Sequence, residues 1–235
     1  MTNAPKQSAD PTERPAGYDA AYYLSRKASD EGHAEQVIIR DLAGEHGRGA
    51  VIDVGCGVGE LLDILGPRRG IGIDTNAMAI DMATEAFPDH QFRLGDACNL
   101  GVEPGSVDCI VSCHLFEHLS DPQAALAAWH AALRPGGRLV IATPNGRSAH
   151  PEIFHDDDHK HIYTGDELAA MVARANFTVE RILTVLPWGV PALMKVPFLW
   201  RLQASVSLRR LPRVPLLRWL GVTLMLSAVK PDAAN

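Results

Sequence analysis

The sequence lacks the features that mark membrane-spanning, exported and zinc-ribbon proteins. Its 235 residues contain no charge-free apolar run of about 18 residues, the length that a spanning helix needs, which excludes a multi-pass membrane protein. The polar first 17 residues have no apolar signal-peptide core, so we expect a disordered leader at 1–17 and a cytoplasmic protein. The four cysteines include no Cys-x-x-Cys pair, which is typical of reduced thiols in that compartment.

Charged side chains are also few, at 21% of the chain, and they are unevenly distributed. With 22 basic and 28 acidic residues the chain is mildly acidic, which gives no support to a nucleic-acid partner. The stretch from Arg181 to Lys230, by contrast, has eight basic residues and no acidic ones. Three of the four tryptophans, Trp188, Trp200 and Trp219, lie there as well. We therefore expect this stretch to form a distinct surface.

The sequence does contain a regular alternation of short apolar runs and helix-like segments. Strands are predicted at five apolar runs: 50–55, 70–74, 91–96, 107–113 and 138–143. Helices are predicted before Ala50 and, with Asn76 and Asp121 as N-caps, over 76–86 and 122–133. Such alternation predicts an α/β fold with a doubly wound, mostly parallel sheet that helices cover on both faces.

The C-terminal part adds one helix and two strands to this pattern. Thr164 and Glu167 have the spacing of a capping box, which opens a helix that runs to about Ala175. Strands are predicted at 177–185 and 223–230, and the second of them closes the sheet.

The stretch between these two strands is expected to form a helical cap at 185–220, inserted into a single domain that spans 18–235. Five prolines break it into short pieces, and an apolar segment of this size needs a partner surface. Three roles remain open: a lid over the acceptor, contact with an anionic membrane surface, or a helical layer buried on the core.

The segment most specific for a ligand is the glycine-rich turn after the strand at 50–55. Gly55, Gly57 and Gly59 let the backbone approach a ligand without a Cβ atom in the way. Asp74 ends the next strand, 19 residues after the first of these glycines. An acidic side chain there is suited to accept hydrogen bonds from two ribose hydroxyls, so we expect an adenosine-type ribose without a 2′-phosphate.

Two ligands compete for this turn. A dinucleotide such as NAD requires Gly-x-Gly-x-x-Gly, but Glu60 stands at the third glycine position, and its carboxylate would face the pyrophosphate. S-adenosylmethionine is favoured instead because it is cationic, with a sulfonium and an amino-acid end that Asp53 and the turn could orient. A turn that only links strand to helix is a third interpretation.

In the order and spacing of its motifs, the segment 37–230 resembles the class I S-adenosylmethionine-dependent methyltransferases, particularly the small-molecule type related to ubiquinone-biosynthesis O-methyltransferases. The resemblance rests on the turn from Asp53 to Gly59, on Asp74, on Gly95-Asp96-Ala97 and on the segments VDCIVSCHLFEHLSDP, LRPGGRLVIATPN and DHKHIYTGDELAAMVARANFTVERI. It implies a Rossmann-like sheet with an antiparallel last strand, and S-adenosylmethionine as methyl donor. The expected donor contacts are Asp53, Gly55, Cys56, Gly57, Gly59, Asp74, Thr75, Asp96, Ala97 and His114.

Methyl transfer from a sulfonium asks little of the protein beyond proximity and alignment, because the leaving group is already good. A general base is needed only for acceptors that must lose a proton. His118, at the carboxyl end of the strand at 107–113, is the first choice as base, and His159 and His161 are the next. The alternative for His118 is a histidine that only packs against the loop.

Two clusters have the composition of metal sites. His114, Glu117 and His118 have i, i+3, i+4 spacing, which on a helical turn brings three side chains to one side. The resemblance implies a divalent metal held by two glutamates and a histidine in ubiquinone-pathway relatives, but this chain has His114 at the first position. The run from His155 to His161 is the second cluster, or else a solvated acidic loop. We expect no metal at either.

These patterns predict a class I methyltransferase that modifies oxygen on a small-molecule or lipid-linked metabolite. A non-catalytic S-adenosylmethionine-binding module and an NAD-dependent oxidoreductase are the alternatives. A nucleic-acid acceptor is disfavoured, because Thr143-Pro144-Asn145 stands where such enzymes carry an Asn/Asp-Pro-Pro-aromatic element. The patterns predict no oligomeric state, and they allow peripheral membrane contact through 185–220.

Overall fold

The computed structural model describes residues 30–148, 158–185 and 221–232. The expected leader at 1–17 lies outside these residues, as does the expected cap at 185–220 apart from Val185, so both stay predictions. None of the helices in the described part is long and apolar enough to cross a membrane.

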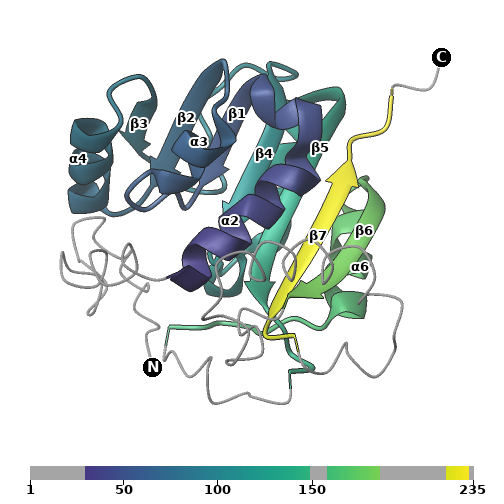
Figure 1. Cartoon of the computed structure of the whole chain (residues 1–235). Coiled ribbons are helices and arrows are strands. Elements are labelled where there is room, and N and C mark those ends of the chain that lie inside the picture. Colours follow the sequence, from purple (N-terminus) through teal and green to yellow (C-terminus); the bar gives the residue numbers. More distant parts are fainter. Residues whose placement is uncertain (1–29, 149–157, 186–220, 233–235) are drawn as a thin grey trace, which may run out of the picture.

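The described strands form a seven-stranded sheet in the order β3-β2-β1-β4-β5-β7-β6 (Figure 1). Their bounds are β1 (Ala50–Val54), β2 (Arg69–Asp74), β3 (Gln91–Leu94), β4 (Val107–Cys113), β5 (Leu133–Pro144), β6 (Thr178–Val185) and β7 (Thr223–Val229). The pairs from β3 to β5 are parallel, whereas β7 pairs antiparallel with both β5 and β6. The predicted α/β, Rossmann-like, mostly parallel sheet with an antiparallel last strand is confirmed.

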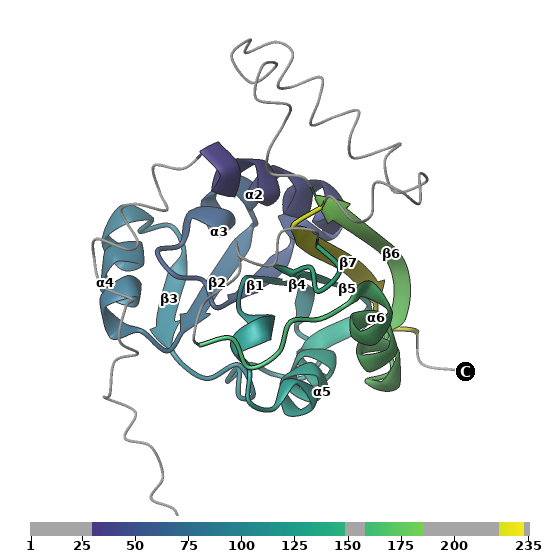
Figure 2. The same cartoon turned by 90° about the horizontal axis from the view of Figure 1, so that it is seen from below.

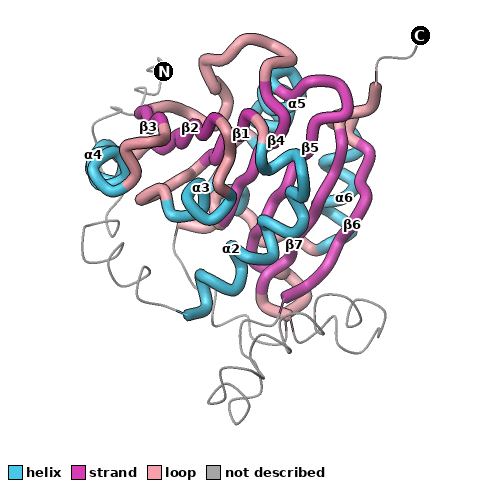
Figure 3. The backbone as a smooth tube through the Cα atoms, turned by 45° about the horizontal axis from the view of Figure 1, so that its top comes forward, coloured by secondary structure: helices cyan, strands magenta, loops and turns pink. Residues whose placement is uncertain are grey.

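Helices lie on both faces of this sheet (Figures 2 and 3). One face carries α2 (Asp30–Ala43) and α3 (Glu60–Leu65), and the other carries α5 (Pro122–Ala132) and α6 (Gly165–Arg174). A fifth helix, α4 (Ala77–Ala86), packs on β2 and β3 at the edge of the sheet. Two short 3-10 helices, η1 (Gly44–Arg48) and η2 (Phe116–His118), precede β1 and follow β4.

Each face of the sheet has its own apolar core, because successive side chains of a strand point to opposite faces. Val51 and Cys109 pack with residues of α2 and α3, whereas Ile52 and Ile110 pack with the buried Trp129 of α5 on the other side. The strands are therefore buried on both faces, which explains their nearly continuous apolar runs.

The predicted helix caps are confirmed. The Asn76 side chain accepts hydrogen bonds from the backbone N–H groups of the first turn of α4, and the Asp121 side chain accepts one from Ala124 at the start of α5. Thr164 and Glu167 form the complete capping box of α6. These contacts are local, which is why the sequence alone was enough to predict them.

The predicted boundaries differ most from the observed ones at the start of β5 and the end of β3. The helix predicted over 122–133 ends at Ala132, and β5 begins at Leu133 rather than at 138, because Leu133 already pairs with Val107 of β4. The strand predicted over 91–96 ends at Leu94, because the chain turns at Asp96, whose carbonyl accepts a hydrogen bond from the Asn99 N–H.

The sheet register brings one end of every central strand to the same edge. Cys113 at the end of β4 pairs with Ala142 near the end of β5, and Pro144 pairs with Thr223 at the start of β7. Val185 at the end of β6 pairs with the same Thr223. The segment 186–220 is therefore joined to the sheet at the carboxyl-end edge, where ligands of open parallel sheets bind.

A glycine pair tests how tightly the turn after β1 is packed. Gly59 has φ +87°, and a Cβ atom there would lie 2.7 Å from the Phe92 ring, whereas Gly66 has φ +59° and open space around it. Gly66→Ala should cost about 1–2 kcal/mol of unfolding free energy from backbone conformation alone. Gly59→Ala should cost roughly 1–3 kcal/mol more because of the added clash, as measured by urea denaturation. Equal losses in the two variants would contradict this packing.

Candidate active site

The glycine-rich turn lies at the carboxyl end of β1 and bends over β2. Gly55, Gly57 and Gly59 all have positive φ angles, of 76°, 50° and 87°. The backbone N–H groups of Gly55 and Cys56 both donate to the carbonyl of Ile73 in β2, at 2.8 and 3.1 Å. Left-handed backbone at alternate positions explains why the sequence has glycine there.

Asp74 braces this turn with its side chain. One carboxylate oxygen accepts a hydrogen bond from the Gly57 N–H at 2.9 Å, and the other accepts one from the Asn76 N–H, also at 2.9 Å. Burial raises the pKa of Asp74, although these backbone hydrogen bonds act in the opposite direction. Each carboxylate oxygen can accept a further hydrogen bond, so the expected contact with ribose hydroxyls is compatible with this bracing and stays a prediction.

Asp53 is the least satisfied acidic group of the turn. Asp53 is 1% exposed, and its Oδ1 atom has no hydrogen-bond partner among the described residues. Burial, helped by the charge of Asp74, raises the pKa of Asp53 to about 8. A buried carboxylate without a partner is unfavourable unless a cation faces it. The residues present therefore fit a cationic ligand such as S-adenosylmethionine.

The remaining residues expected at the donor lie at the same edge of the sheet. The Cys56 thiol is buried, which raises its pKa, and Thr75 and Asp96 are exposed. Ala97 is buried, and its carbonyl accepts a hydrogen bond from the indole N–H of Trp129 at 2.9 Å. The carboxyl ends of β1, β2 and β3 thus lie at this edge. The contacts of the individual residues with the donor stay predictions.

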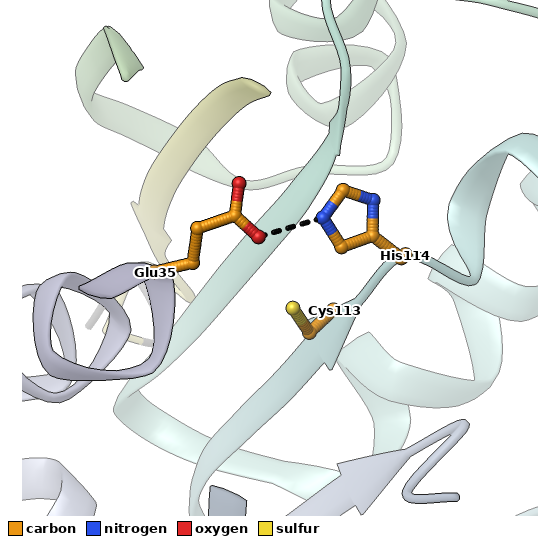
Figure 4. Close-up of side chains that lie close together, drawn as sticks. All are labelled: Glu35, Cys113 and His114. Carbon is orange, nitrogen blue, oxygen red and sulfur yellow. Dashed lines mark hydrogen bonds and ion pairs between the residues drawn. The ribbon is translucent and has the colours of Figure 1, made fainter. Parts of the chain in front are cut away.

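His114 lies between two carboxylates. Its Nε2 atom is 2.8 Å from Glu35 of α2 (Figure 4). Its Nδ1 atom is 3.4 Å from Glu117. Burial alone lowers the pKa of His114, but Glu35 and Glu117 together outweigh it and raise the pKa to about 10. Both ring nitrogens are therefore paired with carboxylates of the protein. If the His114 side chain contacts S-adenosylmethionine, that contact has to compete with these ion pairs.

His114, Glu117 and His118 do not share one helical turn. His114 has a left-handed φ of 53°, and only Phe116–His118 forms a short 3-10 helix. The three side chains still meet, because Glu117 contacts both rings. Glu117 is 1% exposed and accepts a hydrogen bond from the Thr143 hydroxyl at 2.9 Å. Burial raises the pKa of Glu117, but the hydrogen bond and charge of His114 leave it lowered.

His118 is held on two sides. Its Nδ1 atom is 3.3 Å from the backbone carbonyl of Asp158, and its Nε2 atom is 3.9 Å from Glu117. The His159 ring lies edge-on to it at 4.8 Å between centroids. Backbone N–H groups of 160–161 donate to the Glu117 carbonyl at 2.8 and 3.2 Å, which fixes the second histidine segment beside the first.

The structure separates the three histidines that the sequence proposed as bases. His118 and His159 lie together, whereas His161 is exposed, packs on Tyr163 at 4.5 Å and lies 4.0 Å from Glu167. Glu35 was missed altogether, because it lies 79 residues before His114 and belongs to no motif. Its place in the site becomes clear from its contact with His114 in the folded protein.

Two groups of side chains in the described part have metal-ligating atoms within 4.8 Å of one another, Glu35 with Cys113 and His114, and Glu117 with His118 and His159. An ion pair joins Glu35 to His114 and another joins Glu117 to His118, whereas the buried Nδ1 atom of His159 has no hydrogen-bond partner among the described residues. Residues 155–157 of the second predicted cluster lie outside the described residues. The expectation of no metal stays a prediction.

A family model for the methyltransferase domain matches residues 27–182. The chain therefore belongs to the methyltransferase domain family. Its sheet is that of the class I S-adenosylmethionine-dependent methyltransferases, with the glycine turn and Asp74 at the ends of β1 and β2.

Curated relatives agree with this family. The chain is 29% identical over 158 residues to a probable S-adenosylmethionine-dependent methyltransferase of Mycolicibacterium smegmatis, covering 64% of this chain and 60% of that protein. It is 33% identical over 119 residues to the ubiquinone biosynthesis O-methyltransferase of Cupriavidus pinatubonensis, covering 46% and 45%. The chain thus spans about half the length of the curated relatives it matches.

Solved structures share the fold. A solved complex between the Haloferax volcanii Trm112 methyltransferase activator and a methyltransferase contains a chain with a TM-score of 0.68 at 22% identity, covering 92% of this chain and 96% of that one. A methyltransferase of Archaeoglobus fulgidus gives the same TM-score at 20% identity, with coverages of 90% and 100%.

The raised pKa of Asp53 gives a test of donor binding. A cationic donor favours the ionised carboxylate, so binding below about pH 8 must release a proton from Asp53. The affinity for S-adenosylmethionine, measured by titration calorimetry, should rise between about pH 6 and 7.5, by at most roughly tenfold per pH unit. Asp53→Asn should bind more weakly, and its affinity should change little over this range. A pH-independent affinity in the unmodified protein would rule out the contact.

Proposed function

We propose that this protein transfers a methyl group from S-adenosylmethionine to an oxygen of a small-molecule or lipid-linked metabolite. The observation that carries the proposal is the pairing of His118 with the buried Glu117 at the carboxyl end of β4, on the same sheet edge as the glycine turn and Asp53. A positioned base is what a hydroxyl acceptor requires and what a more nucleophilic acceptor does not.

The turn, Asp53 and Asp74 would hold the donor. When bound, the donor supplies a methyl group on a sulfonium, which leaves as a neutral thioether. The unpartnered Asp53 carboxylate supports a place for one of the donor's positive charges, and Asp74 at the end of β2 supports a place for the ribose. The protein's contribution here is orientation of the methyl group and exclusion of water.

The hydrogen bond to Asp158 defines which nitrogen of His118 can act as base. A carbonyl oxygen only accepts, so the Nδ1 atom carries the proton of the neutral ring, and the lone pair is on Nε2. As the acceptor oxygen forms its bond to the methyl carbon and the carbon–sulfur bond breaks, the hydroxyl proton passes to Nε2. The Glu117 carboxylate, 3.9 Å from Nε2, stabilises the imidazolium that forms.

The nature of the acceptor is supported by named relatives. Curated proteins that this chain resembles are ubiquinone biosynthesis O-methyltransferases, and a solved structure with a TM-score of 0.62 is a geranyl diphosphate methyltransferase bound to GPP. We therefore infer an acceptor among small-molecule or lipid-linked metabolites, and the cytoplasmic location stays an expectation from the sequence.

The first experiment supplies radiolabelled S-adenosylmethionine with a set of phenols, catechols and prenylated phenols. His118→Ala should lower kcat by about 10²–10⁴-fold without weakening donor binding, since the ring acts on the acceptor proton. His90→Ala, at the opposite end of β3, is the matched control and should keep full activity. Full activity of His118→Ala would transfer the role of base to His159 or His161. Donor binding without methyl transfer to any acceptor would favour a binding module.

The segment 186–220 is the second part of the proposal. It joins the sheet at the edge that holds His118, so we infer that it covers the acceptor side and contacts a lipid surface. Each basic residue near an anionic membrane contributes about 1 kcal/mol.

Liposome co-sedimentation tests this role of the segment. Binding should increase with the fraction of anionic lipid, fall with salt, and drop when Arg209, Arg210 and Arg213 are changed to glutamate. If the unmodified protein stays in the supernatant with anionic vesicles at low salt, the segment acts as a lid without membrane contact.

A further inference from the structure

A chain of buried polar groups crosses the carboxyl-end edge of the sheet from α2 to η2. The Thr223 hydroxyl of β7 donates to Glu35, Glu35 pairs with His114, His114 pairs with Glu117, and Glu117 accepts from the Thr143 hydroxyl of β5. The side chains of Glu35, His114 and Glu117 are 8%, 18% and 1% exposed, so water screens them little. The order of groups is hydroxyl, carboxylate, imidazole, carboxylate, hydroxyl.

The charges of His114 and Glu117 depend on each other. The pKa of His114 is raised to about 10 and that of Glu117 is lowered, so at neutral pH His114 is an imidazolium and Glu117 is a carboxylate. The Nε2 atom of His118 lies 3.9 Å from Glu117. An ionised carboxylate at that distance stabilises a positive charge on the neighbouring ring.

We propose that Glu35 is a positioning residue for proton removal by His118, because it holds His114 in its charged form and that cation keeps Glu117 ionised beside His118. The inference rests on the proposed function, in which His118 is the general base. Glu35 itself touches neither donor nor acceptor and acts through two side chains.

Geometry explains why Glu35 rather than Glu117 controls the charge of His114. The distance from Nε2 to Glu35 is 2.8 Å, which is that of a charge-assisted hydrogen bond, whereas Nδ1 lies 3.4 Å from Glu117. The left-handed backbone of His114 directs its ring between the two, and a strained non-glycine residue of this kind is frequent at functional sites.

Removing the charge of Glu35 removes the closer of the two carboxylates that hold the proton on His114. If His114 loses its proton, the buried Glu117 lacks its cation and takes up a proton itself. The described groups that face His118 are Glu117, His159 and the Asp158 carbonyl, and those that face His114 are Glu35, Glu117 and Cys113.

The decisive measurement needs no acceptor. Long-range ¹H–¹⁵N spectra of the histidine rings report whether each ring nitrogen carries a proton. In the unmodified protein His114 should have both nitrogens protonated at pH 8, and in Glu35→Gln it should be a neutral ring at that pH. A neutral His114 ring in the unmodified protein at pH 8 would overturn the inference, even if every variant at Glu35 failed to fold.

Kinetics then separate positioning from a structural role. Glu35→Gln should lower kcat about tenfold, change the donor KM less than about twofold, and move the acid limb of the kcat profile to lower pH. Glu35→Asp, which keeps the charge, should restore part of kcat, and Thr223→Val should lower it less. Glu45→Gln, on the exposed surface just after α2, is the matched control.

The outcomes distinguish this inference from the proposed function. If the unmodified protein transfers no methyl group to any acceptor, the proposed function fails, whatever the spectra show. If it is active and Glu35→Gln keeps the same kcat and pH profile, the inference fails and the proposed function stands.

Discussion

A carboxylate taken out of water requires a positive charge or several hydrogen-bond donors beside it, and this constraint organises the carboxyl-end edge of the sheet. Glu35 and Glu117 meet it with His114 and two threonine hydroxyls. Asp53 does not meet it within the described residues. The protein's own side chains thus meet the constraint beside Glu35 and Glu117, whereas Asp53 lacks a partner among the described residues. A sulfonium or ammonium group is the ligand chemistry that supplies it.

The fold was largely predictable because its signals are local. Asn76, Asp121 and Thr164 cap helices through contacts within three residues, and every predicted strand appears in the sheet. The error between α5 and β5 occurred where pairing with a distant strand outweighed the local pattern. Leu133 extends the helical pattern of α5 in the sequence, but pairing with Val107 makes it the first residue of β5.

The candidate site was predictable only in part, for the same reason. The glycine turn and Asp74 follow strands that can be read from the sequence, so their positions were foreseen. Helical spacing suggested that His114, Glu117 and His118 meet, and they do, but through a left-handed residue rather than a helical turn. Glu35 has no local signal, because its partner His114 lies 79 residues away and its partner Thr223 lies 188 residues away.

The place of β7 between β5 and β6 has a consequence for the order in which the molecule assembles. Among the described strands β7 is the last in sequence, yet β6 joins the sheet only through it. During synthesis the strands from β1 to β5 can pair as they emerge, but β6 must wait for residues about 40 positions further along the chain. The hydroxyl that fixes Glu35 arrives with the same strand. A nascent chain can therefore form the glycine turn and its contact with Asp74 well before Thr223 reaches Glu35.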